Sequence, residues 1–247
     1  MRNKMDWEET RQRYTAWWRG ERLERCLLWV TAPREGLGPE PEPARPASPE
    51  ERWTDLAYLS ALNDYEQRRT FYGAEAFPTW CPGYPGHVSL PTFYGCPLRL
   101  DWDTGWTDPI LTEGPLDPAR IVLKRSGRWW DFQFALLKHA RRAAAGKSIP
   151  SICAIYGVGD TLAALRGGQA LLFDLADQPE VVRDIELALV DDWVEILTLQ
   201  TDLLKDGGYW YATWFPLWAP GRFYPTQCDA SYGISPATFR DVYVPAL

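Results

Sequence analysis

The stretch that decides the fold is Tyr209-Trp210-Tyr211-Ala212-Thr213-Trp214, an apolar run of strand length. A helix is expected to end just before it, at Asp206-Gly207-Gly208. A long loop rich in aromatic residues and proline follows, and a new helix opens at Ser235-Pro236. A strand that leads polar residues into a loop beneath a helix start is how α/β enzymes build their sites. The stretch therefore predicts an α/β enzyme with site residues around Asp229.

The same strand-then-helix pattern recurs along the chain. Apolar runs predict further strands at residues 26–31, 75–80 and 151–156. Periodicity and capping signals predict helices at 6–19, 48–71, 128–145, 161–166, 169–175 and 179–205. Buried strands that are each followed by helix indicate parallel pairing through βα crossovers. We expect an incomplete (β/α)8 TIM barrel of about four to five βα units, truncated at its C-terminal end. A self-contained open α/β sheet is the alternative.

We expect a single partial barrel domain over residues 1–247, with residues 1–24 as an N-terminal helical extension. Residues 81–125 are irregular and rich in proline, glycine, tryptophan and aspartate. Loops of this length are uncommon unless they serve a function, so we expect an excursion on the active face, with some strand near Leu98–Trp102.

Composition excludes several classes of protein. The formal net charge is −7, which argues against a nucleic-acid partner because phosphate binding needs a concentrated basic face. The sequence has no apolar run of membrane-spanning length and no signal segment, so a cytoplasmic protein is expected. The five cysteines have no paired spacing, and two histidines are too few for a histidine-based metal site. The 14 tryptophans suggest a cleft walled by aromatic side chains, although core packing explains most of them equally well.

Several motifs resemble the uroporphyrinogen decarboxylase-like superfamily, which comprises the heme-pathway decarboxylase and the corrinoid- or thiol-directed methyltransferases. They occur in the family's order: Arg25-Cys26 with Pro33-Arg34, Gly73–Pro78, Asp160-Thr161-Leu162, Gly167-Gly168, Leu171–Leu175, Pro179–Val182, Cys228-Asp229, Ile234-Ser235-Pro236, Phe239 and Pro245. The resemblance covers most of the chain. It implies a (β/α)8 barrel whose last three or four units are missing here.

The chain departs from the decarboxylase pattern at three places. Of the two arginines that bind substrate carboxylates in the family, one is retained, as Arg34 in the stretch 32–36. The catalytic aspartate expected after the second strand falls at Trp80-Cys81, and the expected tyrosine corresponds to about Leu165. Porphyrinogen decarboxylation by the usual set of groups is therefore not expected.

The methyltransferase branch of the family uses zinc held by His and Cys ligands to make a thiolate nucleophile. In the family these ligands lie beyond residue 247. We therefore predict no cofactor within this chain, and zinc or corrinoid in the full-length protein. The resemblance names a small-molecule substrate, a corrinoid protein and a second copy of the chain as the partners to consider.

The candidate site residues follow predicted strand ends, where barrel sites are built. Arg34 would bind a substrate carboxylate, or else is a surface arginine. The loop 80–87 places Trp80, Cys81 and His87 together, as substrate contacts or as a packed loop. Asp160 would cap the next helix, which we favour, or meet substrate.

A second group of candidates follows the last predicted strand. Trp214 and Arg222, with Trp218 and Tyr224, would form an aromatic and cationic wall for a planar ligand, or pack the loop. Asp229 is the strongest catalytic candidate, beside Tyr232, and its alternative is a structural turn. His139 is expected on a helix surface.

The function expected from these residues is that of a lyase or a methyltransferase acting on a tetrapyrrole-related or methylated small molecule. Proton transfer without a cofactor would serve the first reaction, and zinc-activated thiolate attack the second. The alternative is a non-catalytic ligand-binding protein on the same scaffold, which the loss of the family's catalytic groups supports.

Overall fold

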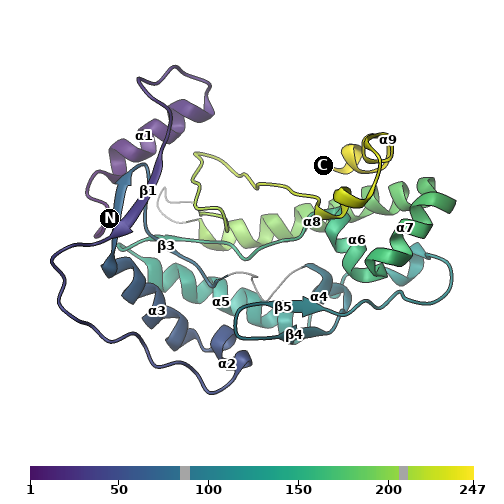
Figure 1. Ribbon diagram of the computed structural model, residues 1–247, viewed down its shortest axis with the longest axis horizontal. Coiled ribbons are helices and arrows are strands. Elements are labelled where there is room, and N and C mark those ends of the chain that lie inside the picture. The colour runs from purple at the N-terminus through teal and green to yellow at the C-terminus, as the bar shows by residue number, and fades with distance from the viewer. Residues whose placement is uncertain (84–89, 206–210) are drawn as a thin grey trace. The chain divides into compact units, whose positions relative to one another are not determined.

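The computed structural model describes residues 1–83, 90–205 and 211–247 (Figure 1). The chain divides into two compact units. The first unit comprises Met1–Tyr84, Phe134–Cys153 and Gln200–Tyr224. The second comprises Pro85–Gln133, Ala154–Leu199 and Pro225–Leu247. Each unit is therefore built from three separate stretches of the sequence, and each is described by itself.

The core of the first unit contains a small parallel sheet. Strand β3 (Thr79–Trp80) pairs in parallel with β6 (Ile149–Pro150), and Ser151 forms a parallel bridge with Ala212. The bridge is made by hydrogen bonds from the Ile152 amide to the Ala212 carbonyl and from the Ala212 amide to the Pro150 carbonyl, both at 3.0 Å. The predicted parallel pairing is confirmed only at Thr79–Trp80 with Ile149–Pro150 and at Ser151 with Ala212. The predicted helix end at 206–208 and the first two residues of the predicted strand at 209–214 lie outside the described residues. No sheet in the described residues closes, so the incomplete barrel stays a prediction.

The first predicted strand differs from its expectation. Strand β1 (Trp29–Pro33) lies later than residues 26–31, is exposed along its length, and pairs antiparallel with β2 (Thr70–Ala74). The prediction of a buried parallel strand is therefore wrong here. An apolar run shows that a segment suits a strand, but it does not tell which neighbour the strand will pair with.

A buried ion-pair cluster holds the start of this ribbon. The Glu75 carboxylate, which is 1% exposed, accepts hydrogen bonds from Arg13 at 2.7 Å and from both terminal nitrogens of Arg25 at 2.7 and 2.8 Å. The Leu28 amide also donates to Glu75 at 2.8 Å. Burial alone would raise the pKa of Glu75, but the bonds from Arg25, Leu28 and Arg13 outweigh it and lower the pKa to about 2.

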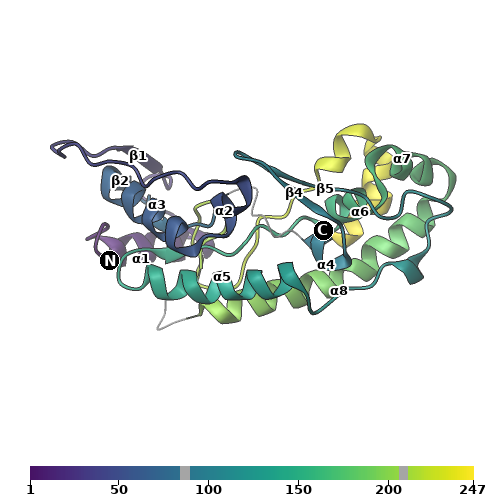
Figure 2. The same cartoon turned by 90° about the horizontal axis from the view of Figure 1, so that it is seen from below.

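Helix α1 (Trp7–Trp18) belongs to the first unit, and Figure 2 labels it close to the N-terminus. Its buried residues are Trp7, Thr10 and Tyr14. Trp7 and Tyr14, one heptad apart, are both 2% exposed and pack edge-on against Phe77 and Trp218. The expected helix at 6–19 is confirmed within one residue at each end.

The helix predicted at 48–71 is present as two helices, α2 (Pro49–Thr54) and α3 (Leu56–Arg69). Ser48 caps α2 as expected, by accepting the Glu51 amide at 3.2 Å. The break falls at Asp55, because its carboxylate accepts the amides of Ala57 and Tyr58 and starts a new helix there.

Two long helices contribute residues to both units. Helix α5 spans Arg128–Ala144 and α8 spans Pro179–Leu204, close to the predicted ranges. The mean hydropathy of the chain is −0.34, and no helix in the described part of the chain is long and apolar enough to cross a membrane.

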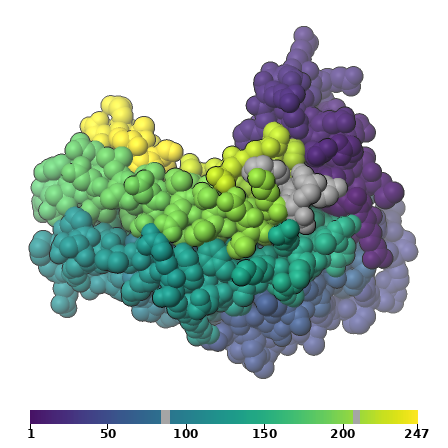
Figure 3. Space-filling view, turned by 180° about the vertical axis from the view of Figure 1, so that it is seen from behind, coloured from purple at the N-terminus to yellow at the C-terminus, as the bar shows by residue number. Residues whose placement is uncertain are grey.

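The second unit is mainly helical. It contains α4 (Leu90–Tyr94), the hairpin of β4 (Leu98–Leu100) and β5 (Gly105–Thr107), the short helix η1 (Pro118–Arg120), α6 (Val158–Arg166), α7 (Gly168–Asp177) and the turns η2 (Asp229–Gly233), α9 (Pro236–Thr238), η3 (Phe239–Tyr243) and η4 (Val244–Ala246). The strand expected near Leu98–Trp102 is confirmed as the hairpin. Figure 3 shows the last turns, in yellow, on the green surface of α6–α8.

A buried ion pair ties the long excursion to the helices of the second unit. Arg166 Nε donates to Asp174 Oδ2 at 2.7 Å, and both side chains are 8% exposed. Arg166 also donates to the carbonyl of Leu111, which belongs to the stretch 81–125. This part of the excursion is therefore held by a buried, charge-assisted contact.

Candidate functional site

Asp160 lies in the first turn of α6, in the second unit, but it does not cap that helix. Its Oδ1 atom accepts the backbone amide of Ala230 at 3.0 Å, and the N-terminus of α6 at Gly157 has no side-chain cap. The capping role favoured from the sequence is therefore wrong. The carboxylate instead holds the turn that follows Cys228, and its Oδ2 atom is buried without a hydrogen-bond partner in the described residues.

Glu186 is a buried carboxyl group beside Asp160. It lies on the apolar face of α8, between Val182 and Leu189, and is 0% exposed. Neither carboxyl oxygen has a hydrogen-bond partner in the described parts of the chain. Burial, and then the charge of Asp160, raise the pKa of Glu186 to about 8. The group is therefore protonated at neutral pH and can act as an acid.

Three further polar groups either follow Asp160 in the chain, as Thr161 does, or feel the charges of the two carboxyls, as Cys228 and Tyr243 do. The Thr161 and Tyr243 hydroxyls are buried and have no hydrogen-bond partner among the described residues. Burial, and then the charges of Asp160 and Glu186, raise the pKa of the half-buried Cys228 thiol to about 12. Burial and the charge of Glu186 also raise the pKa of Tyr243. We call Asp160, Thr161, Glu186, Cys228 and Tyr243 the carboxyl cluster.

Two glycines allow the segments of the carboxyl cluster to approach closely. A Cβ atom on Gly159 would lie 2.8 Å from Tyr243 Cε1 and 2.9 Å from Cys228 Sγ, closer than side chains tolerate. A Cβ atom on Gly157 would collide with the carbonyl oxygen of Gln227. Gly157 and Gly159 are therefore required for the start of α6 to pack against the C-terminal segments of the unit.

The chemistry available in the carboxyl cluster is proton transfer. Buried carboxyls whose pKa is raised into the neutral range are typical of acid–base sites. The Cys228 thiol stays neutral at physiological pH, so it is a weak nucleophile. No group of three or more His, Cys, Asp or Glu side chains among the described residues is placed to hold a metal ion. The zinc and corrinoid predictions concern ligands beyond residue 247 and stay predictions.

The structure brings two of the predicted residues together. Asp229 is exposed, its Oδ2 accepts a hydrogen bond from Gln227 at 3.3 Å, and its charge contributes, after burial, to raising the pKa of Asp160. Thus the residues predicted after two different strands meet in the second unit. Tyr232, predicted beside Asp229, is 96% exposed.

The other predicted residues lie in the first unit, and His87 falls outside the described residues. Arg34 is exposed just after β1. Trp80 is 1% exposed and packs near His139, with ring centroids 5.8 Å apart. Cys81 exchanges two backbone hydrogen bonds of 2.9 Å with the Asn63 carboxamide, and burial raises the pKa of its thiol.

Two predicted wall residues also have structural partners. Trp214 is half-buried and packs on Phe215, with ring centroids 4.0 Å apart. Arg222 is exposed and pairs with Asp202 at 3.0 Å.

His139 is not the surface residue predicted from the sequence. It is half-buried, and its Nε2 atom lies 2.7 Å from the Ser60 hydroxyl. Its neighbours Lys138 and Arg141 suggested a solvated helix face, but His139 lies toward the packed side of α5.

Sequence reasoning missed Glu186 and Tyr243. A signal for Glu186 was present, because it follows Val182 by four residues and precedes Leu189 by three, which places a carboxyl on the buried stripe of α8. Tyr243 had no such signal, since its position depends on how the last turns fold back on α6.

No protein-family model matches the chain, no curated protein matches it, and no solved structure matches it. The resemblance to the uroporphyrinogen decarboxylase-like superfamily thus rests on the sequence motifs and stays a prediction.

Proposed function

We propose that this chain is the acid–base part of a cytoplasmic lyase related to the uroporphyrinogen decarboxylase-like superfamily, acting on a carboxylated, tetrapyrrole-related small molecule. One observation carries the proposal: Glu186 is a fully buried carboxyl without a hydrogen-bond partner in the described residues, and its pKa is raised to about 8. Such a group costs stability, and carboxyls whose pKa is strongly raised by burial are concentrated at functional sites.

The carboxyl cluster would replace a group that the family pattern lacks here. The position of the family's catalytic aspartate is occupied by Trp80 and Cys81, neither of which is an acid at neutral pH. Glu186, Asp160 and Asp229 form a series from a fully buried carboxyl to an exposed one, coupled electrostatically in that order. We infer that Asp229 meets the substrate and that Asp160 and Glu186 supply the proton.

The reaction balances with this assignment. In a decarboxylation the bond between the substrate carbon and its carboxylate breaks, carbon dioxide leaves, and the electron pair stays on the carbon. That carbon takes up the proton that Glu186 gives up through Asp160, while Asp229 contacts the substrate. Solvent then reprotonates the cluster, so no redox partner or cofactor is consumed.

Methyl transfer is the second candidate chemistry and non-catalytic ligand binding the third. A methyltransferase would need a thiolate, whereas burial raises the pKa of Cys81, Cys96, Cys153 and Cys228. Raised thiol pKa values and a protonated carboxyl favour the lyase among the three.

The test uses the whole chain with freshly reduced uroporphyrinogen, and separates the products by the number of carboxylates that remain. We expect slow decarboxylation that falls by roughly a hundredfold in Glu186→Gln, since general acids contribute about this much. Glu180→Gln is the matched control, because Glu180 is an exposed glutamate of the same helix. Equal activity of the two variants would contradict the assignment of the acid.

The other candidate functions give different outcomes with the same protein. Transfer of a methyl group from methylcobalamin to a thiol, without decarboxylation, would favour the methyltransferase. Quenching of tryptophan fluorescence by uroporphyrin without turnover of either substrate would favour ligand binding. Either result would overturn the lyase proposal.

A further inference from the structure

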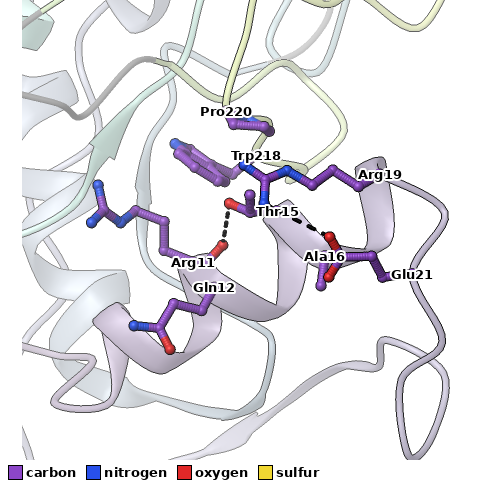
Figure 4. A pocket seen from close by; sticks show the side chains of 8 residues that line it. All are labelled: Arg11, Gln12, Thr15, Ala16, Arg19, Glu21, Trp218 and Pro220. Atoms are coloured by element: carbon purple, nitrogen blue, oxygen red, sulfur yellow. Dashed lines mark hydrogen bonds and ion pairs between the residues drawn. The ribbon is translucent and has the colours of Figure 1, made fainter.

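The first unit has two surface features that the lyase proposal does not use. One is a groove on helix α1, where Arg19 pairs with Glu21 (Figure 4) and Arg11 pairs with Glu8, so its charges are balanced within the chain. The other is the ribbon of β1 and β2, whose outer edge offers backbone hydrogen-bonding groups instead of charges. The ribbon is the feature that lacks a partner in the described residues.

The hydrogen bonds at the two ends of the ribbon show which edge of β1 is free. The Arg34 amide donates to the Arg69 carbonyl at 2.7 Å, and the Glu75 amide donates to the Leu28 carbonyl at 3.0 Å. In antiparallel strands, successive residues alternate between bonding to the neighbouring strand and facing away from it. The even-numbered residues of β1 therefore bond to β2. The residues that direct their backbone groups to the outer edge are the odd-numbered ones: Trp29, Thr31 and Pro33.

This outer edge is open to a further strand. All residues of β1 are exposed, and β2 is its only neighbouring strand in the described part of the chain. Edge strands are commonly protected by a charged side chain, but β1 carries none. Pro33 protects the edge in part, because it has no N–H. The amides of Trp29 and Thr31 can still donate to a strand that arrives there.

One face of the ribbon is apolar and exposed to solvent. A Cβ atom on Gly73 would lie 3.0 Å from the Phe71 ring and 3.6 Å from Val30 Cβ, so these side chains share a face. Phe71 is 52% exposed, Val30 is 45% exposed, and Leu28, on the same face by alternation, is 43% exposed. A ribbon of only two strands is marginally stable in water and gains from joining a wider sheet. A further strand on β1 would therefore stabilise the ribbon.

The sequence of β1 is complementary to itself when two copies run antiparallel. A two-fold axis at Thr31 places Thr31 opposite Thr31 of a second copy, and Trp29 opposite Pro33 of that copy. Each Thr31 amide then meets a Thr31 carbonyl, and each Trp29 amide meets a Pro33 carbonyl. The missing N–H of Pro33 falls opposite a Trp29 carbonyl, so no amide of either edge is left unpaired.

The side chains of β1 also suit this register. Val30 of each copy would lie opposite Ala32 of the other copy on the exposed face, with Cβ atoms about 5 Å apart. Because β1 carries no charge, no like charges meet across the axis. The strand has 5 residues, whereas a standard interface uses about 20–30 residues a side. The area is therefore small for a stable dimer, and we expect a weak, reversible one.

We propose that β1 is a dimerisation edge, at which two copies of the chain join their ribbons into one antiparallel sheet about a two-fold axis at Thr31. The occupant is a second copy because β1 itself supplies every donor and acceptor that the pairing needs. The inference does not rest on the lyase proposal, since it uses no residue of the carboxyl cluster.

The test is sedimentation equilibrium of the whole chain, at protein concentrations from about 1 μM to about 1 mM, a range that covers weak association. We expect a reversible equilibrium between monomer and dimer. Thr31→Pro should weaken dimerisation about tenfold or more, because it removes the hydrogen bonds at the axis. It leaves the bonds between β1 and β2 in place, since the Thr31 amide does not face β2. Thr31→Val is the matched control, because it keeps the amide and the shape of the side chain, and it should dimerise like the wild type.

Thr31→Lys tests the same axis without changing the backbone, and it decides the matter if Thr31→Pro does not fold. It sets two lysines opposite each other, so dimerisation should weaken at low salt and recover in part at about 1 M salt, where charges are screened. A chain that stays monomeric over the whole concentration range would overturn the proposal. A dimer that Thr31→Pro and Thr31→Lys leave unchanged would use another surface, and equal losses in Thr31→Pro and Thr31→Val would show that the edge amide is not used. Either result would also overturn the proposal.

Discussion

Replacing Glu186 by glutamine should change how the stability of the protein depends on pH. Glutamine has nearly the shape of a protonated glutamate but cannot ionise. In the folded protein the pKa of Glu186 is raised to about 8 from an ordinary value of 4.5. At any pH where the unfolded chain has already released this proton, the wild-type glutamate therefore lowers the free energy of unfolding. The glutamine does not, because it has no proton to release.

The sign and size follow from linkage. Because the folded state holds the proton between pH 4.5 and about 8 while the unfolded state has lost it, the wild-type protein loses stability as pH rises through that window. The loss is about 1.4 kcal/mol for each pH unit. Below pH 4.5 Glu186 takes nothing from the free energy of unfolding, and above about pH 8 the loss it causes stops growing. Between about pH 5.5 and 7.5 the wild type should lose about 2.7 kcal/mol relative to Glu186→Gln.

The assay is urea unfolding followed by tryptophan fluorescence at several pH values, for wild type, Glu186→Gln and the control Glu180→Gln. Subtracting the free energy of unfolding of the wild type from that of each variant removes the pH dependence that the two proteins share. We expect the difference for Glu186→Gln to grow in favour of the variant as pH rises, while that for Glu180→Gln stays flat. A difference for Glu186→Gln that does not change with pH would refute the reasoning.

Three further predictions concern the packing and charge of the two units. Gly159→Ala should lower the free energy of unfolding by about 1–3 kcal/mol, because its Cβ would lie 2.8 Å from Tyr243 Cε1; Gly38→Ala, with open space around it, is the control in thermal melts. Glu75→Gln should cost about 3 kcal/mol by urea unfolding at neutral pH, since it leaves Arg13 and Arg25 without their shared carboxylate. The pKa of Glu75 is lowered to about 2, so its contribution is present above pH 4.5 and should fade as pH falls toward 2; a constant difference would contradict the ion-pair account. Ser48→Ala should cost about 1 kcal/mol in urea unfolding, through the lost cap of α2, and no loss would show that the cap is not needed.

Much of the local structure could be predicted from the sequence. The apolar spacing was sufficient to predict α1, and Ser48-Pro49 was sufficient to predict the start of α2. Helices can be predicted in this way because they are specified by residues close in sequence. The parallel pairing of β3, β6 and Ala212 could also be anticipated, since each strand is followed by a helix. The antiparallel β1–β2 ribbon could not, because its register depends on segments some 40 residues apart.

The candidate site was predictable only in part. Asp160 and Asp229 were found because they follow strands, but the role of Asp160 was wrong. Helix caps and tertiary hydrogen bonds use the same carboxylate, and only the position of Ala230 decides between them. Glu186 was visible as a charge on an apolar stripe. Its missing hydrogen bonds could not be predicted, because they depend on which groups pack around it in the folded unit.

The most direct test of the acid–base account is the titration of Glu186 itself. Carbon-13 NMR of protein labelled at the glutamate carboxyl follows each glutamate as pH is changed. The account predicts one resonance that titrates near pH 8, far above the ordinary value of 4.5, and that disappears in Glu186→Gln. A spectrum in which every glutamate titrates near or below 4.5 would contradict it.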